Sequence, residues 1–278
     1  MDDAPRLPGK AWRLVATMLV LAWSLGPILL VVLASFKEPR QIFEVPFRLV
    51  FEPTLDNFRV LARDNPEFFR ALWNSFVVTA GATLLALVAS FCAGYVFARA
   101  RHLAYRGSAF AMLLVRMLPP IVVTVPLFPV INQLALNDTH LLLILLYAAF
   151  YVSLGSWMMR SFVTRVPIEL EEAAAIDGAS LPQILRLVVL PLTAQGLVAV
   201  ALFVVVFAWN EYVFAMIFTT TNARTAPVVI GEMMSTAEGV QWGAVFAAAT
   251  IQLVPVLALV IGLQRFLVAG LTAGAVKS

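Results

Sequence analysis

The sequence predicts an all-α integral membrane protein, because its apolar residues are too many for a soluble fold and lie in long runs. Of its 278 residues, 62% are hydrophobic and 13% are charged, and the mean hydropathy is +0.92. Soluble domains have roughly 45–50% apolar and about 25% charged residues. Each helix that crosses a bilayer takes about 20 apolar residues, so six crossings use about 120–150 residues. This leaves no room for a large soluble catalytic domain.

Six apolar runs have the length of a transmembrane helix. The first, residues 14–34, follows Arg6, Lys10 and Arg13. It is longer than the apolar region of a typical signal peptide, so we interpret it as a retained anchor helix. The others are residues 72–97, 108–131, 141–159, 191–218 and 242–266. We therefore expect six transmembrane helices.

The distribution of basic residues predicts that both termini are cytoplasmic, since Lys and Arg accumulate at the cytoplasmic ends of transmembrane helices. The loop after the second run carries Arg99, Arg101 and Arg106 and no acidic residue. In segment 37–71, six basic residues are balanced by six acidic ones. We expect an anchor helix with an extracytoplasmic segment (1–71), a core of five helices (72–266) with a cytoplasmic loop (160–190), and a cytoplasmic C-terminal tail (267–278).

The cytoplasmic loop has the local signals of a helix, a turn and a second helix. Pro167 suits the first helical position, where its missing N–H is not needed. Three glutamates follow within the first turns, where the helix dipole favours negative charge. Gly178 permits the left-handed conformation that ends a helix. Ser180 with Gln183 forms a capping-box pattern for the next helix, which Pro191 is expected to bend.

Two interpretations fit this short helix at the membrane surface. Its small alanine side chains allow a soluble partner to pack closely against it. By displacing this short helix, the partner would then move the attached membrane helices. Alternatively, it rests on the lipid headgroups as an amphipathic helix. Headgroup-binding helices are usually basic on their polar face, whereas this segment contains Glu169, Glu171 and Glu172. The charge favours docking to a partner.

The same loop resembles the EAA signature of ABC importer permeases. That pattern is Glu-Ala-Ala, three residues, Gly, nine residues, then Ile-x-Leu-Pro. Here it is met by Glu172-Ala173-Ala174, Gly178 and Val188-x-Leu190-Pro191, with Val188 in place of Ile. The resemblance extends over nearly the whole chain and is strongest to the second-type permeases of carbohydrate importers, the maltose-permease-like group. It implies a type I ABC importer permease fold in a bacterial or archaeal plasma (inner) membrane.

The resemblance also implies partners and sites. Such importers pair this chain with a second permease subunit, two ATPase subunits and an extracytoplasmic solute-binding protein. The residues expected to couple to the ATPase are Glu171, Glu172, Ala173, Ala174, Asp177, Gly178 and Ala179. Gly270, Thr272 and Gly274 of the tail are expected to contact the ATPase subunits, the alternative being a frayed end. The chain lacks a G-x-x-x-x-G-K-[ST] loop, so ATP and Mg are expected on the partners, and this chain is not expected to be an enzyme.

Polar groups within the apolar runs allow two readings each. Trp209, Asn210 and Glu211 either line the solute pathway, with the ring stacking on a sugar, or pair structurally within the assembly. Pro119 and Pro120 break a helix, which is tolerated where the freed carbonyls face protein or a wet cavity, so we expect this helix to line the solute pathway or a gate. Arg116 either snorkels to the cytoplasmic surface or serves a site. The other candidates, Cys92, His102 and His140, are too scattered for a metal site.

Other functions fit less well. A secondary transporter of a small polar solute would carry coupling carboxylates at the bilayer midplane and often internal repeats, and we find neither. An intramembrane enzyme would show a metal-ligand cluster or a nucleophile–base pair. A net charge of +3 without a basic stripe argues against nucleic-acid binding. An ABC permease for a polyol or a glycerol phosphate remains an alternative to a permease for a di- or oligosaccharide.

Overall fold

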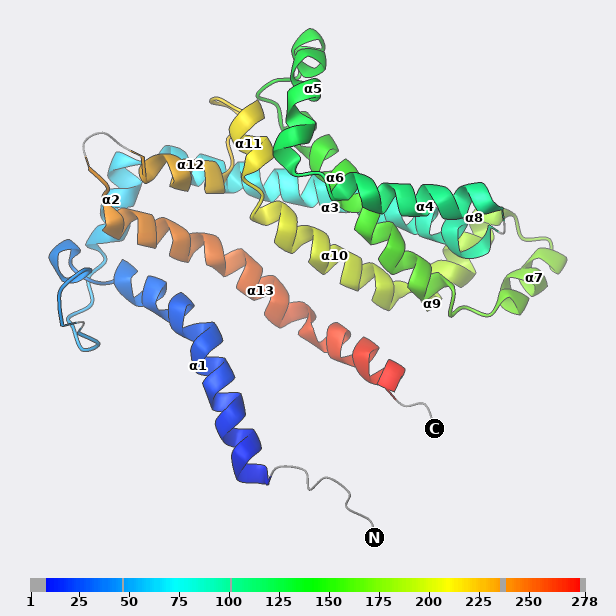
Figure 1. Cartoon of the computed structure of the whole chain (residues 1–278), viewed down its shortest axis with the longest axis horizontal. Coiled ribbons are helices and arrows are strands. Elements are labelled where there is room, and N and C mark those ends of the chain that lie inside the picture. The colour runs from blue at the N-terminus through cyan, green and yellow to red at the C-terminus, as the bar shows by residue number, and fades with distance from the viewer. Residues whose placement is uncertain (1–8, 47, 101, 236–238, 276–278) are drawn as a thin grey trace. The chain divides into compact units, whose positions relative to one another are not determined.

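The computed structural model describes residues 9–46, 48–100, 102–235 and 239–275, and every regular element in these ranges is a helix (Figure 1). The chain divides into two compact units. The first comprises the chain up to residue 68 together with residues 230–253, and the second comprises residues 69–229 and the chain from residue 254 onward. Each unit is considered by itself.

The first unit contains α1 (Lys10–Ser35), the 3-10 turn η1 (Pro39–Gln41) and α2 (Asp56–Asp64). The amide of Asn57 donates hydrogen bonds to the carbonyls of Ser35 (2.9 Å) and Lys37 (2.7 Å), which ties α2 to the end of α1. Most side chains of α1 are exposed, including Trp23 at 86%. An exposed apolar helix is covered by lipid or by another protein in a membrane, as expected for the anchor.

The second unit is built around α3 (Glu67–Arg99), α6 (His140–Val163) and α10 (Ala194–Trp209). Its core contains fully buried side chains from all three helices, such as Val78, Tyr147 and Val204. Gly94 of α3 lies so close to α6 that a Cβ atom there would be 2.5 Å from Cβ of Met159. This contact brings the two helix backbones together at the end of α3 that precedes Arg99.

The predicted run 108–131 is wrong as a continuous helix. It forms α4 (Leu103–Arg116) and α5 (Pro120–Gln133), separated by Met117, Leu118 and Pro119. Two consecutive prolines disfavour helical dihedrals in the residues that precede them and remove backbone donors. The break that we expected from Pro119 and Pro120 is confirmed, with Pro119 as the N-cap residue and Pro120 as the first residue of α5.

The predicted run 191–218 is also divided. It comprises α9 (Leu190–Leu192), α10 and α11 (Val213–Phe218), with breaks at Thr193 and at residues 210–212. The chain continues through α12 (Ala226–Met233) to α13 (Trp242–Ala275). The predicted runs 14–34, 72–97, 141–159 and 242–266 each fall within one continuous helix, α1, α3, α6 and α13.

Four of the described helices are long and apolar enough to cross a membrane: Trp12–Ser35, Glu67–Arg99, His140–Val163 and Trp242–Gly262. Leu181–Leu192 and Ala194–Trp209 form a pair bent by 78°, and they provide a fifth crossing if they act as one span. The chain is thus a multi-helix membrane protein with four or five such crossings.

Candidate functional site: the surface helix and its anchor

The predicted helix–turn–helix is present in the loop after α6. Helix α7 spans Ile168–Ile176, with Pro167 as its N-cap residue rather than its first helical residue. Glu169 and Glu171 lie in the first turn, where they complement the partial positive charge of the helix N-terminus. The helix is nine residues long, so its stability in water depends on contacts with the rest of the chain.

Gly178 ends α7 as the sequence predicts. Its φ is +86°, a left-handed conformation that costs a residue with a side chain about 1–2 kcal/mol. The N–H of Gly178 donates to the carbonyl of Ala175 (3.0 Å) and that of Ala179 to Ala174 (3.0 Å), the pair of hydrogen bonds that defines a Schellman motif. The backbone therefore reverses tightly after Asp177, and α7 protrudes as a compact hairpin.

The segment after the turn leads back to the bundle. Ser180 and Gln183 form the predicted capping box at the start of α8 (Leu181–Ile184). A π-helical turn follows at Leu185–Val189, just before Pro191, whose ring nitrogen cannot donate to the preceding turn. The chain bends by 78° before α10, and the hydroxyl of Thr193 at the bend donates to the carbonyl of Val189 (2.8 Å).

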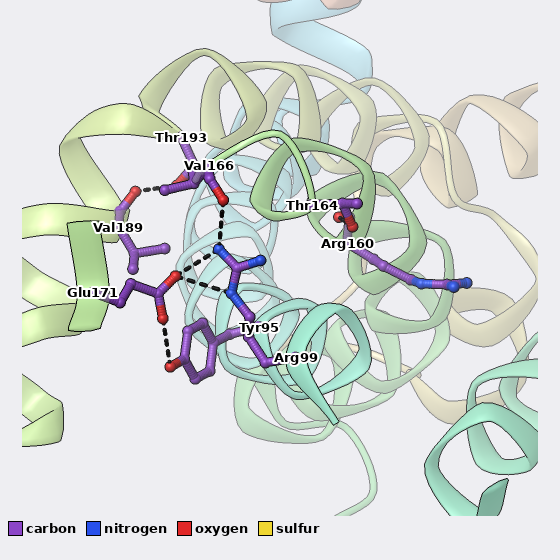
Figure 2. Close-up of polar contacts among 8 residues, drawn as sticks. All are labelled: Tyr95, Arg99, Arg160, Thr164, Val166, Glu171, Val189 and Thr193. Atoms are coloured by element: carbon purple, nitrogen blue, oxygen red, sulfur yellow. Dashed lines mark hydrogen bonds and ion pairs between the residues drawn. The ribbon is translucent and has the colours of Figure 1, made fainter. Parts of the chain in front are cut away.

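The inner face of α7 is fixed to α3 by a buried ion pair, shown in Figure 2. Arg99 donates from Nε (2.9 Å) and Nη2 (2.6 Å) to Oε1 of Glu171, and the hydroxyl of Tyr95 donates to Oε2 (2.9 Å). Arg99 Nη2 also donates to the carbonyl of Val166 (2.8 Å). Tyr95 and Arg99 are four residues apart on α3, so they lie on the same face of that helix.

Burial of this ion pair raises the free-energy cost of breaking it. The side chains of Arg99 and Glu171 are 16% and 8% exposed. Removal of one partner from a buried pair typically costs roughly 3–5 kcal/mol, because the other charge is left uncompensated. The pair therefore fixes the position of α7 relative to the end of α3.

The outer face of α7 is exposed and of mixed character. Glu172, Ala173, Asp177 and Gly178 are all exposed, while Ala174 and Ala179 are half-buried and pack against the core. Exposed apolar side chains flank the acidic residues: Ile168 at 42%, Leu170 at 45% and Ile176 at 86%. Large apolar side chains beside charges on a protruding helix are typical of a protein-docking surface.

Sequence reasoning grouped Glu171 with the outward-facing residues, but its carboxylate is directed into the chain. It also missed Arg99 and Tyr95 as parts of the site. The signal that was present is the i, i+4 spacing of Tyr95 and Arg99 at the end of a transmembrane run.

The predicted tail contacts lie in α13, which continues through Ala275. The backbone of Gly270, Thr272 and Gly274 is thus helical, and their side chains are outside the described part of the structure.

The three polar candidates after α10 have different environments. Trp209 is buried and lines an apolar cavity of about 210 Å³ with Thr79, Val205 and Pro255. The exposed Asn210 donates from its amide to the carbonyl of Val206 (2.8 Å).

The carboxylate of Glu211 is hydrogen-bonded to backbone groups of this chain. The backbone N–H groups of Phe214 (2.9 Å) and Ala215 (3.3 Å) donate to its carboxylate. These groups belong to the first turn of α11, so Glu211 caps this helix.

A second carboxylate with several hydrogen-bond donors lies at the end of α6 opposite to α7. Asp138 precedes α6, and its carboxylate accepts hydrogen bonds from the backbone N–H groups of Thr220, Thr221, Asn222 and Ala223, at 2.8 to 3.1 Å. Burial by itself would raise the pKa of Asp138, but these hydrogen bonds outweigh it and lower the pKa to about 2. Asp138 thereby holds the loop between α11 and α12.

The fold is similar to a solved structure of a bacterial ABC transporter involved in the import of the acidic polysaccharide alginate. The match has a TM-score of 0.75 at 19% sequence identity and covers 93% of this chain and 98% of that chain. The two chains therefore share a fold.

The chain belongs to the family described as the binding-protein-dependent transport system inner membrane component, whose model matches residues 86–273. The chain is 33% identical to the trehalose/maltose transport system permease protein MalG of Thermococcus litoralis, over 95% of each protein. It is 35% identical to the trehalose transport system permease protein SugB of Mycobacterium tuberculosis, over 96% of this chain and 97% of the relative. The predicted resemblance is thus confirmed, and these relatives are permeases rather than enzymes.

Proposed function

We propose that this chain is a transmembrane subunit of an ATP-driven importer that moves a di- or oligosaccharide into the cytoplasm, and that α7 couples it to a separate ATPase. The observation that carries the proposal is the construction of α7. Its outer face presents Glu172, Ala173 and Ile176 to solvent, while Glu171 fixes its inner face to Arg99. A helix that is exposed on one face and fixed on the other can transmit motion from a partner.

The membrane arrangement in this proposal has six crossings, type I permease topology and cytoplasmic termini. Helices α4 and α5 together form the third crossing, broken at Pro119, and α9 to α11 form the fifth. The end of α3 that carries Arg99 and the α7 hairpin then lie on the same cytoplasmic side. Asp138 lies on the extracytoplasmic side, because α6, which lies between Asp138 and α7, has 24 residues, or about 36 Å of helix.

The assembly contains a second, different permease subunit, two ATPase subunits and an extracytoplasmic solute-binding protein. ATP and Mg bind to the ATPase subunits, and this chain supplies no nucleotide site. The carbohydrate assignment is supported by the names of the relatives, which are permeases for trehalose and maltose. The location is the plasma (inner) membrane of a bacterium or archaeon.

The Arg99–Glu171 ion pair explains how α7 transmits the motion of the ATPase subunits. When the ATPase subunits close, they displace α7, and the Arg99–Glu171 pair transfers the displacement to the end of α3. The turn at Gly178 and the bend at Thr193 allow α7 to move while α8 leads the chain back into α10. The helices then alternate between inward-open and outward-open states.

The test is Gly178→Asp in the complete transporter. The expected result is loss of ATP-driven sugar uptake, with normal membrane insertion, because Asp adds bulk and strain at the end of the docking helix. Gly239→Asp is the matched control, since Gly239 also has a positive φ (+98°) and a Cβ there meets nothing within 4 Å. Co-purification of the ATPase and full uptake in the Gly178→Asp variant would disprove the coupling role.

A further inference from the structure

An arginine lies beside a cavity in the second unit without a counter-charge. The cavity has a volume of about 250 Å³, is partly open and is lined by residues of α4, α5, α6 and α11. Its lining is mostly apolar and includes Met112, Val123, Leu127, Leu146 and Phe214. Arg116, the last residue of α4, is the one charged residue among the residues that line it.

Aromatic rings hold the guanidinium in place. Its central carbon is 5.0 Å from the ring centroid of Phe203, 5.7 Å from that of Phe150 and 6.0 Å from that of Tyr151. Arginine is attracted to the faces of such rings within about 6 Å of their centroids. The head group is thus held among the rings, which is not the snorkelling arrangement considered above.

The charge of Arg116 is only partly compensated. Its Nη1 atom is buried and has no hydrogen-bond partner among the described residues. No carboxylate in the described part of the chain forms an ion pair with Arg116. Glu211 accepts hydrogen bonds from the first turn of α11 instead. Rings and a helix C-terminus attract a cation, but neither supplies an acceptor for Nη1.

The depth of Arg116 increases the cost of this arrangement. It lies thirteen residues after Leu103 at the start of α4, which is about 20 Å along the helix. The hydrocarbon core is roughly 30 Å thick, so Arg116 lies well inside it if α4 begins at the cytoplasmic surface as proposed. Ionisable residues at such depth usually face the bundle interior and mark solute or ion pathways.

We propose that this cavity binds the anionic group, a carboxylate or a sulfonate, of an acidic sugar in transit. The proposal rests on the proposed function and specifies the class of solute. A neutral hydroxyl can accept a hydrogen bond from Nη1 but leaves the half-buried positive charge unbalanced. A carboxylate or sulfonate accepts charge-assisted hydrogen bonds and also neutralises the guanidinium, which suits the planar donor geometry of arginine.

The test measures binding to the complete transporter, reconstituted in lipid without its binding protein, at pH 7. The two probes are digalacturonate and its dimethyl ester, which have the same sugar rings but differ in charge. The wild type is expected to bind digalacturonate at least 10-fold more tightly than the ester. Arg116→Gln is expected to reduce this ratio to about 1, and Arg116→Lys to keep part of it. Arg59→Gln, which alters an exposed pair with Asp56, is the control and is expected to keep the full ratio.

Equal affinities in the wild type, or an unchanged preference in Arg116→Gln, would overturn the anion site. A phospholipid headgroup offers similar chemistry, so native mass spectrometry is performed with and without phosphatidylglycerol. Retention of phosphatidylglycerol by the wild type but not by Arg116→Gln, with no digalacturonate preference, would also overturn the proposal. ATP-driven uptake of a neutral sugar without charge preference refutes only the acidic-sugar assignment, whereas failure to assemble with an ATPase refutes the proposed function.

Discussion

The ion pair between Arg99 and Glu171 leads to a quantitative prediction. Glu171 receives two hydrogen bonds from Arg99 and one from Tyr95. Replacement of Arg99 by Met leaves the carboxylate buried with only the tyrosine hydroxyl as partner. Replacement of Glu171 by Leu leaves a guanidinium that is 16% exposed without its acceptor. Each single substitution is expected to destabilise the docking of α7 by roughly 3–5 kcal/mol.

The double variant Arg99→Met/Glu171→Leu separates this explanation from simple loss of packing. Two apolar side chains of similar volume can replace a buried pair at little cost, so the double variant is expected to regain most of the stability. The assay is reversible unfolding of the reconstituted chain in SDS, analysed as a double-mutant cycle. The same variants are assayed for transport, and the single variants are expected to hydrolyse more ATP per sugar imported. A coupling energy within about 0–1 kcal/mol, typical of an exposed pair, would refute the role of the Arg99–Glu171 pair in holding α7.

Three further predictions follow from other parts of the chain. Because Asp138 has a pKa of about 2, below the value of about 3.9 in unfolded chains, it stabilises loop 219–225 at pH above about 4 and loses this effect as the pH falls toward 2. Proteolysis of the loop is expected to rise in that interval, whereas Asp138→Asn should show the increase already at pH 7. Gly94→Ala is expected to destabilise the α3–α6 packing by about 1–3 kcal/mol, whereas Gly107→Ala, with free space around it, should be neutral or slightly stabilising in the same thermal unfolding assay. Glu211→Ala is expected to cost about 0.5–2 kcal/mol, as for a lost helix cap, while Glu211→Gln should cost less, because its amide oxygen can still accept from the N–H of Phe214; equal losses in both variants would show that the charge rather than capping matters.

Local signals in the sequence predicted the α7 hairpin well. Gly178, Ser180 and Gln183 act through neighbours within a few residues, and their turn and capping box form as expected. The apolar runs likewise predicted α1, α3, α6 and α13, because hydropathy over about 20 residues is a strong signal for a transmembrane helix.

The errors concern interactions between distant residues and breaks within apolar runs. Arg99 and Glu171 are 72 residues apart, so no local sequence pattern indicates that they will form a buried ion pair. Hydropathy averaged over about 20 residues does not show the break at residues 210–212, because long apolar segments flank these three polar residues on both sides. The environment of Arg116 depends on rings from α6 and α10, which are adjacent only in the folded chain.

Cysteine cross-linking in the assembled transporter tests the coupling role of α7 most directly. Ile176 is 86% exposed on the outer face of α7, so Ile176→Cys places a thiol at the proposed interface without disturbing the Arg99–Glu171 ion pair. We expect it to cross-link to a bifunctional reagent attached to the ATPase subunit, with a yield that changes when ATP is added. No cross-link in either nucleotide state, or labelling of this thiol by an impermeant reagent from the extracytoplasmic side, would contradict the coupling mechanism.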